Sequence, residues 1–515
     1  MEVNNLVDLL RRSFADFPAR TAISFGTKKI TYSQLEDFSS RFASALHDLG
    51  VREGDRVAIW LPNRPEFIYA IFGILKAGGI VVPINTMFKR EEARFILEDC
   101  RVKVLICSLD KVDYSLNITS RCDSLKHLIC IPGCENKRVV FDFYELIDKY
   151  KKIERIGGID ENTPAFILYT SGTTGVPKGA CLSHKNIISN VKGCSAVINF
   201  SKKDCTICIL PLFHSFALTV CVFLPLLKGA KIALMRSLRP FKRVIRSVFK
   251  NRVTVFVAVP AIYNILAEIK LPFSKRIFSI VFNPVRICIS GAAALPYPVW
   301  KKFEQKFRRK LLQGYGLTEA SPVVSLNPLG GLRKPDSIGK PLSSVEVKVI
   351  SRNGKELSVG EVGELMVKGP NVMAGYYNAG EETEKIIENG WLHTGDLARI
   401  DNDGYIYIMG RKKEMINVRG LNVYPREIED LLYKYPKIKE AAVVGARHKH
   451  RGEVPVAFIV KQGEVTAREI LSYLKANLAS YKCPLKLFFK ESLPKNLTGK
   501  ILKKKLQEEV NDTFQ

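Results

Sequence analysis

The chain has 515 residues, 46% of them hydrophobic and 25% charged, which is ordinary for a soluble globular enzyme large enough for more than one domain. Its net charge of +28 is spread along the sequence, without an arginine-rich tail or a basic stripe interleaved with aromatics, so we predict no nucleic-acid partner. The excess charge predicts either a solvated basic surface or a weak peripheral association with anionic membranes.

No segment predicts secretion or a membrane span. The first 17 residues lack an apolar stretch of signal-peptide length. The most apolar run, 206–227, contains two prolines and a histidine, which favours a buried strand and a pocket wall over a spanning helix. The 12 cysteines form no disulfide framework, and Cys205-x-x-Cys208 has no second pair nearby. We therefore expect a cytoplasmic protein with reduced thiols.

The N-terminal fifth alternates helical periodicity with short apolar β runs. Residues 54–85 are predicted to form a strand, a helix and a second strand. A helix is predicted to open near Tyr32, with Ser33 as its N-cap. Such alternation favours a parallel sheet covered by helices.

The first chemical motif lies in residues 165–186. A predicted strand, 165–169, leads into a loop that is rich in glycine and hydroxyl side chains and carries Lys178, and a helix is predicted to begin at Ser183. Backbone N–H groups, hydroxyls and a lysine on such a loop are suited to cradle phosphates. The spacing is not that of a Walker A loop, and the composition alone leaves a flexible surface turn as an equal alternative.

Three further segments carry candidate site residues. Residues 210–214 end in His214, which by itself is more often a core residue, and the apolar run that follows (Phe216, Leu218, Val220, Val222) is suited to a pocket wall or to the core. Residues 287–296 predict a strand and a turn. In residues 311–319, Tyr315 offers a flat face for a purine, and Glu319 a hard carboxylate suited to Mg²⁺.

The C-terminal third supplies a carboxylate and a lysine on glycine-framed loops. Asp396 follows Gly395, and its carboxylate is suited to a bidentate contact with two hydroxyls, although a turn aspartate is the default alternative. Residues 404–414 are predicted to end a hairpin-like run and to begin the last domain. Beyond it helix and strand alternate, and Lys500 follows Gly499 near the end of the chain.

The string Tyr169–Gly179 resembles the phosphate loop of the adenylate-forming superfamily, which contains acyl-CoA synthetases, peptide-synthetase adenylation domains and beetle luciferases. The other motifs match that superfamily in the same order over nearly the whole chain. The resemblance implies an α/β fold with a large N-terminal domain of mixed sheets and helices in a layered arrangement, residues 1–411. It also implies a small, mobile α+β C-terminal domain, residues 412–515.

The resemblance also implies roles for individual residues. It makes Lys500, Glu319, Thr318 and His214 catalytic, with Glu319 on the metal, and Lys413 the hinge. Coenzyme A would meet Gly420 and Arg419. ATP would be bound by Thr170, Ser171, Gly172, Thr173, Thr174, Gly175, Lys178, Gly291, Ala292, Ala293, Gln313, Gly314, Tyr315, Gly316, Asp396 and Arg411.

Some positions differ from the usual pattern. Ala294 stands where proline is usual, and Asn417 and Arg419 are less usual near the glycine of the coenzyme A tunnel. The basic residue that follows the catalytic lysine is usually arginine; here it is Lys503 or Lys504. The change at Ala294 softens the turn but removes no chemical group, whereas Asn417 and Arg419 bear on the details of the contact with coenzyme A.

The implied function is that of an acyl-CoA ligase. It would join an apolar carboxylic acid, such as a medium- or long-chain fatty acid, to coenzyme A through an acyl-adenylate, with ATP and Mg²⁺ as cofactors. Two alternatives remain open: an acyl-AMP ligase that loads a carrier protein, and a catalytically silent nucleotide-binding homologue. The presence of Lys500, Glu319 and Asp396 argues against the silent homologue. The sequence does not indicate an oligomeric state.

Overall fold

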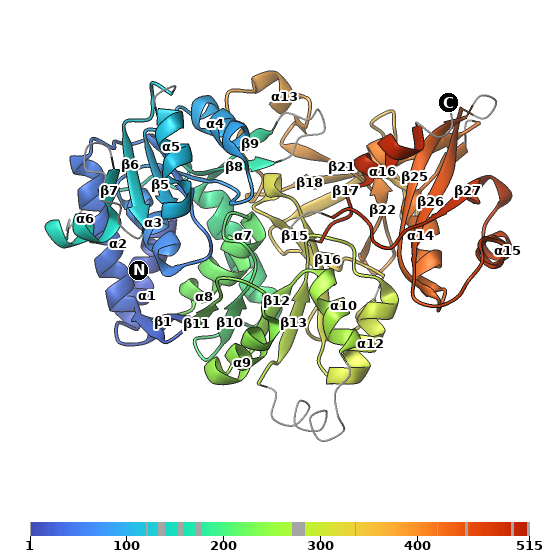
Figure 1. Cartoon of the computed structure of the whole chain (residues 1–515), viewed down its shortest axis with the longest axis horizontal. Coiled ribbons are helices and arrows are strands. Elements are labelled where there is room, and N and C mark those ends of the chain that lie inside the picture. Colours follow the sequence, from blue (N-terminus) through green and yellow to red (C-terminus); the bar gives the residue numbers. More distant parts are fainter. Residues whose placement is uncertain are drawn as a thin grey trace.

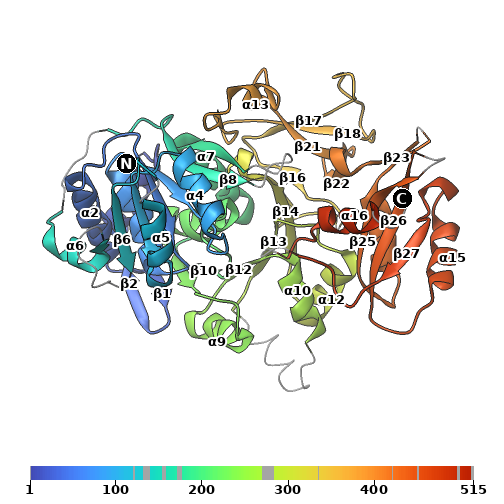
Figure 2. The ribbon, with the colours of Figure 1, turned by 45° about the horizontal axis from the view of Figure 1, so that its top comes forward.

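The computed structural model describes residues 2–119, 122–131, 140–152, 158–170, 177–269, 284–334, 336–419, 421–448, 452–495 and 499–511. The N-terminal segments gather at one end of an elongated molecule and the C-terminal segments at the other (Figures 1 and 2). Four sheets organise the described chain.

The largest sheet has nine strands in the order β16-β15-β14-β13-β12-β10-β11-β1-β2. From β14 to β1 neighbouring strands are parallel, and the strands from β13 to β11 are short and almost wholly buried, as expected for a parallel sheet covered on both faces. The strands are β1 Thr21–Phe25, β2 Lys28–Thr31, β10 Cys205–Cys208, β11 Lys231–Leu234, β12 Val255–Ala258, β13 Ile287–Ser290, β14 Leu311–Gly316, β15 Val323–Leu326 and β16 Lys340–Pro341.

A second sheet of eight strands has the order β19-β9-β8-β4-β3-β5-β6-β7. Its strands from β8 to β7 are also parallel. They are β3 Arg56–Trp60, β4 Ile80–Pro83, β5 Val104–Ser108, β6 His127–Ile131, β7 Val140–Asp142, β8 Pro164–Thr170, β9 Lys178–Ser183 and β19 Gly375–Tyr376.

Two smaller, mainly antiparallel sheets follow. The third sheet contains β17 Glu346–Ile350, β18 Gly363–Lys368, β20 Ile387–Glu388, β21 Trp391–Ile400 and β22 Ile406–Arg411. The fourth contains β23 Ile416–Val418, β24 Leu421–Val423, β25 Ile438–His448, β26 Gly452–Lys461 and β27 Lys486–Phe489. The fourth sheet and its helices form the small C-terminal domain of the predicted α/β fold, beside the large domain of mixed sheets (Figure 1).

Helices cover these sheets. They are α1 Leu6–Asp16, α2 Tyr32–Asp48, α3 Pro65–Lys76, α4 Arg90–Asp99, α5 Val112–Thr119, α6 Phe143–Lys149, α7 His184–Ile198, α8 Leu224–Leu227, α9 Phe241–Asn251, α10 Pro260–Glu268, α12 Tyr297–Phe307, α13 Gly380–Glu384, α14 Pro425–Lys434, α15 Ala467–Asn477 and α16 Lys503–Asn511. Within the described ranges, no helix is long and apolar enough to cross a bilayer.

Local structure confirms most of the predicted elements and corrects one cap. β3, α3 and β4 form the predicted strand–helix–strand unit, and α7 begins directly after its N-cap Ser183. The N-cap of α2 is Thr31, not Ser33, because Thr31 and Gln34 form a reciprocal capping box that satisfies two otherwise unpaired N–H groups. The apolar run 206–227 contains β10, but then continues as a π-helical turn, Ala217–Phe223, and α8.

Candidate active site

A cavity of about 600 Å³ lies where parallel strands of the two large sheets end. Twelve of the candidate residues predicted from the sequence line it: Thr170, Lys178, His214, Gly291, Ala292, Gly314, Tyr315, Gly316, Thr318, Glu319, Arg411 and Lys500. Asp396, Gln313 and Ala293 line an adjacent cavity of about 320 Å³ that shares several of these residues. The chain therefore brings together candidates that are more than 300 positions apart.

The phosphate-loop motif is described at its two ends. β8 and β9 pair antiparallel, with Thr170 opposite Lys178, so both residues stand at the mouth of the loop and face the same cavity. The five remaining loop candidates lie outside the described residues: Ser171, Gly172, Thr173, Thr174 and Gly175. The hairpin geometry is what a loop needs to fold back over a bound anion.

Tyr376 joins the lysine to the candidate metal ligand. Its hydroxyl donates a hydrogen bond to Glu319 Oε1 at 2.8 Å, and Lys178 Nζ lies 5.5 Å from the centre of its ring. Because β19 pairs with β9, Tyr376 stands opposite Ala180, two residues beyond Lys178. Sequence reasoning did not select Tyr376; the only signal was a glycine-tyrosine pair at the end of the predicted β segment 363–378.

The carboxylate of Asp396 is buried, and each of its oxygens has one described partner, which leaves acceptor capacity for a ligand. The hydroxyl group of Tyr315 donates a hydrogen bond to Asp396 Oδ2 at 2.5 Å, and Arg411 Nε lies 3.0 Å from Oδ1. Asp396 on β21 and Arg411 on β22 are paired across the strands, which fixes the second contact. The glycine next to Tyr315 is required, since a Cβ atom on Gly316 would lie 2.0 Å from the carbonyl oxygen of Pro322.

His214 and apolar side chains form a second kind of lining in the larger cavity. Burial lowers the pKa of His214 to about 4, so its imidazole is neutral near pH 7. Phe216 and Val220 line the cavity, whereas Leu218 and Val222 are buried in the core. Further apolar lining comes from Cys194, Ile198, Ala217, Val259, Ile289, Val323 and Leu326.

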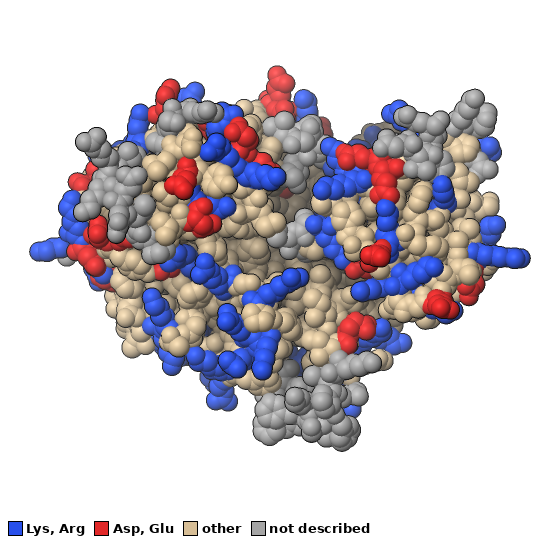
Figure 3. Space-filling model, in the orientation of Figure 1, with Lys and Arg blue, Asp and Glu red and all other residues tan. Residues whose placement is uncertain are grey.

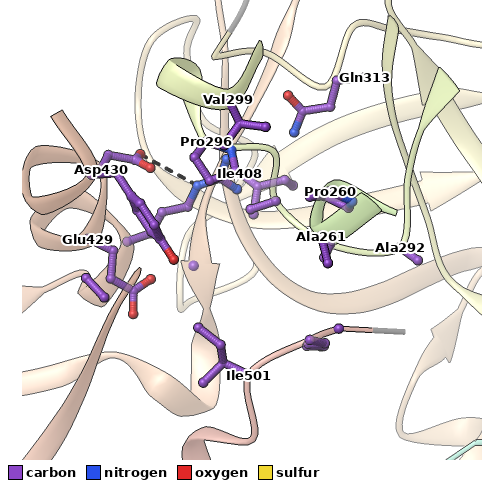
Figure 4. A pocket seen from close by; sticks show the side chains of 18 of the residues that line it. Pro260, Ala261, Ala292, Pro296, Val299, Gln313, Ile408, Glu429, Asp430 and Ile501 are labelled. Atoms are coloured by element: carbon purple, nitrogen blue, oxygen red, sulfur yellow. Dashed lines mark ion pairs between the residues drawn. The ribbon is translucent and has the colours of Figure 1, made fainter. Parts of the chain in front are cut away.

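Lys500 enters the site from the C-terminal domain. It lines both cavities, and its enclosure there, followed by the positive charge of Arg411, lowers its pKa. In Figure 4 the smaller cavity lies between Pro260, Ala261 and Ala292 on one side and Ile501 on another. Side chains of α14, including Asp430 with its ion pair to Arg426 at 3.7 Å, complete the wall.

Lys503 connects the start of α16 to the segment that contains the candidate hinge residue Lys413. Its Nζ lies 2.8 Å from Glu429 Oε1 on α14 and 3.2 Å from Glu414 Oε2, directly after Lys413. Burial disfavours the charged form of Glu414, but Lys503, and then Lys500, hold the pKa of that carboxyl below its usual value. The sequence left Lys503 and Lys504 as candidates for the basic residue after Lys500. Lys503 is the one that forms ion pairs with described residues.

Arg419, one of the two residues predicted to contact coenzyme A, lines neither cavity. β23 and β24 form a hairpin in which Val418 pairs with Leu421, so Arg419 stands at its tip, exposed and with a left-handed φ of 52°. Gly420 lies outside the described residues. The candidate hinge Lys413 lies in the short 3₁₀ turn that follows β22, between the third and fourth sheets.

Comparison with known proteins gives the site its context. A sequence profile described as AMP-binding enzyme matches residues 10–377, and a profile described as AMP-binding enzyme C-terminal domain matches residues 427–500. The chain belongs to the AMP-binding enzyme family. It is an adenylate-forming enzyme of the AMP-forming acid–CoA ligase class. This enzyme class argues against the alternative of a catalytically silent homologue. Three curated relatives of the chain are named as CoA ligases.

Curated relatives in this AMP-binding family align over nearly their whole length. The chain is 37% identical to a long-chain-fatty-acid–CoA ligase of Bacillus subtilis, over 98% of this chain and 95% of the relative. It is 33% identical to a protein of the same name from Escherichia coli O157:H7, over 98% and 94%.

Solved structures of the AMP-binding family agree with the fold. An anthranilate CoA ligase in complex with anthranoyl-AMP aligns with a TM-score of 0.91 at 28% identity, over 99% of this chain and 98% of the other. ATP-bound MatB from Rhodopseudomonas palustris aligns with a TM-score of 0.90 at 31% identity, and apo MatB with 0.83 at 30%, each over 99% of this chain and 100% of the other.

Proposed function

We propose that this ligase activates a medium- or long-chain fatty acid and transfers it to coenzyme A. We also propose that the boundary between its two domains lies between Arg411 and Lys412. The observation that carries the proposal is the larger cavity, in which an apolar lining adjoins Lys178, Glu319 and Lys500. The names of the curated relatives support the fatty acid as substrate.

The first half-reaction needs alignment and charge neutralisation. A carboxylate oxygen attacks the α-phosphate of ATP and displaces pyrophosphate, leaving an acyl-adenylate. Lys178 and the phosphate loop hold the β- and γ-phosphates, while Lys500 bridges the carboxylate and the α-phosphate. Pre-positioned cations act where negative charge develops, and holding the two reactants in line lowers the entropic part of the barrier.

The residues present fit a Mg²⁺ ion that is held partly by ATP. In the described part of the chain no group of three or more acidic, histidine or cysteine side chains could hold a metal alone. Mg²⁺ in nucleotide sites takes one or two carboxylates plus phosphate oxygens, and Glu319 supplies such a carboxylate. When bound, the ion would neutralise charge on the phosphates.

The second half-reaction needs a different domain arrangement. Lys500 occupies the cavity here, while Arg419 at the hairpin tip lies outside both cavities. Rotation about Lys413 would withdraw Lys500 and bring the hairpin with Gly420 to the acyl-adenylate, where the thiol of coenzyme A attacks and AMP leaves. The better fit to ATP-bound than to apo MatB supports an adenylation arrangement in this structure.

A panel of acids tests the substrate. Straight-chain acids from short to long, an aromatic acid and a dicarboxylic acid are each assayed for AMP release with and without coenzyme A. We expect the highest kcat/KM for a medium or long chain, and release that depends on coenzyme A. A preference for the aromatic or dicarboxylic acid, or no effect of coenzyme A, would contradict the proposal.

Asp396→Asn is expected to raise the KM for ATP about tenfold, because a charged acceptor for the ribose hydroxyls becomes a neutral amide with one acceptor oxygen. ATP and 2′-deoxy-ATP are compared on both proteins. The wild type should lose affinity for the deoxy nucleotide, and the variant should lose much less. Equal losses on both proteins would show that Asp396 does not hold the ribose.

Tyr376→Phe removes the hydroxyl that orients Glu319 but keeps the ring below Lys178. Groups that orient a metal ligand typically change metal affinity by about 10–100-fold, so we expect the midpoint of a Mg²⁺ titration of pyrophosphate release to rise about tenfold. Tyr144→Phe serves as the matched control, since its hydroxyl contacts Glu66, far from this site. An unchanged midpoint in Tyr376→Phe would leave the tyrosine without this role.

A further inference from the structure

One segment of the chain contains basic residues but no acidic ones. From 205 to 267 the sequence contains no aspartate or glutamate but nine basic residues: Lys228, Lys231, Arg236, Arg239, Lys242, Arg243, Arg246, Lys250 and Arg252. None of the nine forms an ion pair with any residue that the structure describes. Cations without partners repel one another, so this surface favours an anionic partner.

Helix α9 carries four of these nine cations: Lys242, Arg243, Arg246 and Lys250. Its apolar residues Val244 and Val248 are buried, whereas Lys242 and Arg246, one turn apart, are exposed beside Ile245, which is 38% exposed. Figure 3 shows lysine and arginine side chains gathered over α9 and its surroundings, with no acidic side chains among them. In Figures 1 and 2, α9 lies at the outer edge of the molecule, away from the C-terminal domain.

An adjacent segment of the same chain adds further basic residues to this surface and does not neutralise it. Lys250 Nζ donates a hydrogen bond to the carbonyl oxygen of Gly26 at 3.0 Å, which brings the β1–β2 turn, with Lys28 and Lys29, beside the end of α9. The acidic residues at the two ends of the segment, Asp204 and Glu268, already form ion pairs with basic residues outside it. Asp204 is buried against Arg286 at 2.8 Å. Glu268 pairs with Lys302 at 2.8 Å.

We propose that α9 and the adjoining basic residues form a docking surface for anionic lipid bilayers. Charge complementarity carries the proposal, and the exposed Ile245 adds a small apolar contact at the level of the head groups. The aromatic residues of α9, Phe241 and Phe249, are partly buried, so the helix lacks the exposed stacking platform typical of single-stranded nucleic-acid sites. The choice of lipid also rests on the proposed function, whose substrate partitions into membranes.

Docking of this kind is electrostatic and reversible. The apolar side of α9 packs in the core, so the helix cannot insert, and binding must weaken with salt. Lysines and arginines near an anionic surface contribute about a fivefold increase in affinity each, and this falls off within a Debye length of about 8 Å at physiological salt. Docking would hold the enzyme where its acid substrate is concentrated.

The test uses the whole enzyme without ATP or acid, so its outcome is independent of the substrate assignment. Binding is measured by co-sedimentation with vesicles of phosphatidylcholine alone or mixed with phosphatidylglycerol, at ionic strengths of about 0.01 M and about 0.15 M. Lys242→Gln/Arg246→Gln is compared with Arg468→Gln/Lys475→Gln, which removes one exposed lysine and one exposed arginine from α15.

We expect binding to the mixed vesicles only, stronger at low salt. The α9 variant should bind about 25-fold more weakly, while the α15 variant should bind like the wild type. Both variants should keep wild-type ligase activity with a water-soluble acid, which shows that they fold. Equal loss in the two variants, no binding by the wild type at low salt, or tighter binding of the α9 surface to polyuridylate than to vesicles would overturn the proposal.

Discussion

Lys500→Ala should lower the rate of acyl-adenylate formation by about 10²–10³-fold, the effect of removing one pre-positioned charge from a transition state. Lys500 lines both cavities, beside Arg411 and the buried carboxylate of Asp396. It lies just before α16, so the proposed rotation of the C-terminal domain would withdraw it from the site. Thioester formation from supplied acyl-adenylate and coenzyme A should therefore remain near the wild-type rate.

The two half-reactions are measured separately, as pyrophosphate release and as thioester formation from synthetic acyl-adenylate. Lys495→Ala is the matched control, because Lys495 lies on the same loop but is engaged with Glu440. It should leave adenylation nearly unchanged. If Lys500→Ala forms acyl-adenylate at close to the wild-type rate, or loses both half-reactions equally, the lysine does not have the role proposed here.

Local patterns in the sequence predicted the elements that hold the site. A short apolar run before a glycine-rich loop predicted β8, and a serine before an amphipathic stretch predicted the start of α7. The resemblance to known motifs then predicted which residues would meet, and Thr170, Lys178, Glu319 and Lys500 do line one cavity. Such motifs are readable because each keeps its chemical groups within a few neighbouring residues.

Contacts between distant segments could not be predicted in this way. Tyr376 reaches Glu319 only because β19 joins the edge of a sheet whose neighbouring strand lies almost 200 residues earlier. The unpaired charge on α9 also depends on where the nearest acids point. The run after β10 was ambiguous for another reason: continuous apolar sequence fits a buried strand and a buried helix equally well, and length alone does not decide between them.

Lys503→Met should lower the free energy of unfolding of the C-terminal domain by about 3 kcal/mol, because it leaves two carboxylates without their cation. This value is at the lower end of the range for breaking a buried ion pair, because the side chains of Lys503 and Glu414 are still 20% and 28% exposed to solvent. Lys503→Arg is the matched control. It keeps the positive charge between Glu414 and Glu429, so it should lower the free energy of unfolding much less than Lys503→Met does.

The same variant should slow adenylation more than thioester formation. Lys503 begins α16 three residues after Lys500 and forms an ion pair with Glu414, next to the proposed hinge residue Lys413. Without the ion pairs of Lys503, the segment that carries Lys500 loses one of the contacts that set its position. Denaturant unfolding and the two separate half-reactions, measured where the variant remains folded, check both effects.

Acidification distinguishes loss of the ion pair from loss of packing. The pKa of Glu414 is held below its usual value, so the stability that the bridge contributes is complete above the ordinary glutamate pKa of about 4.3 and is lost as the pH falls through the folded value. The difference between wild type and Lys503→Met should therefore be constant near neutral pH and shrink at acidic pH. A difference that does not change on acidification would mean that the methylene stem of Lys503, not its charge, holds α16 to the hinge.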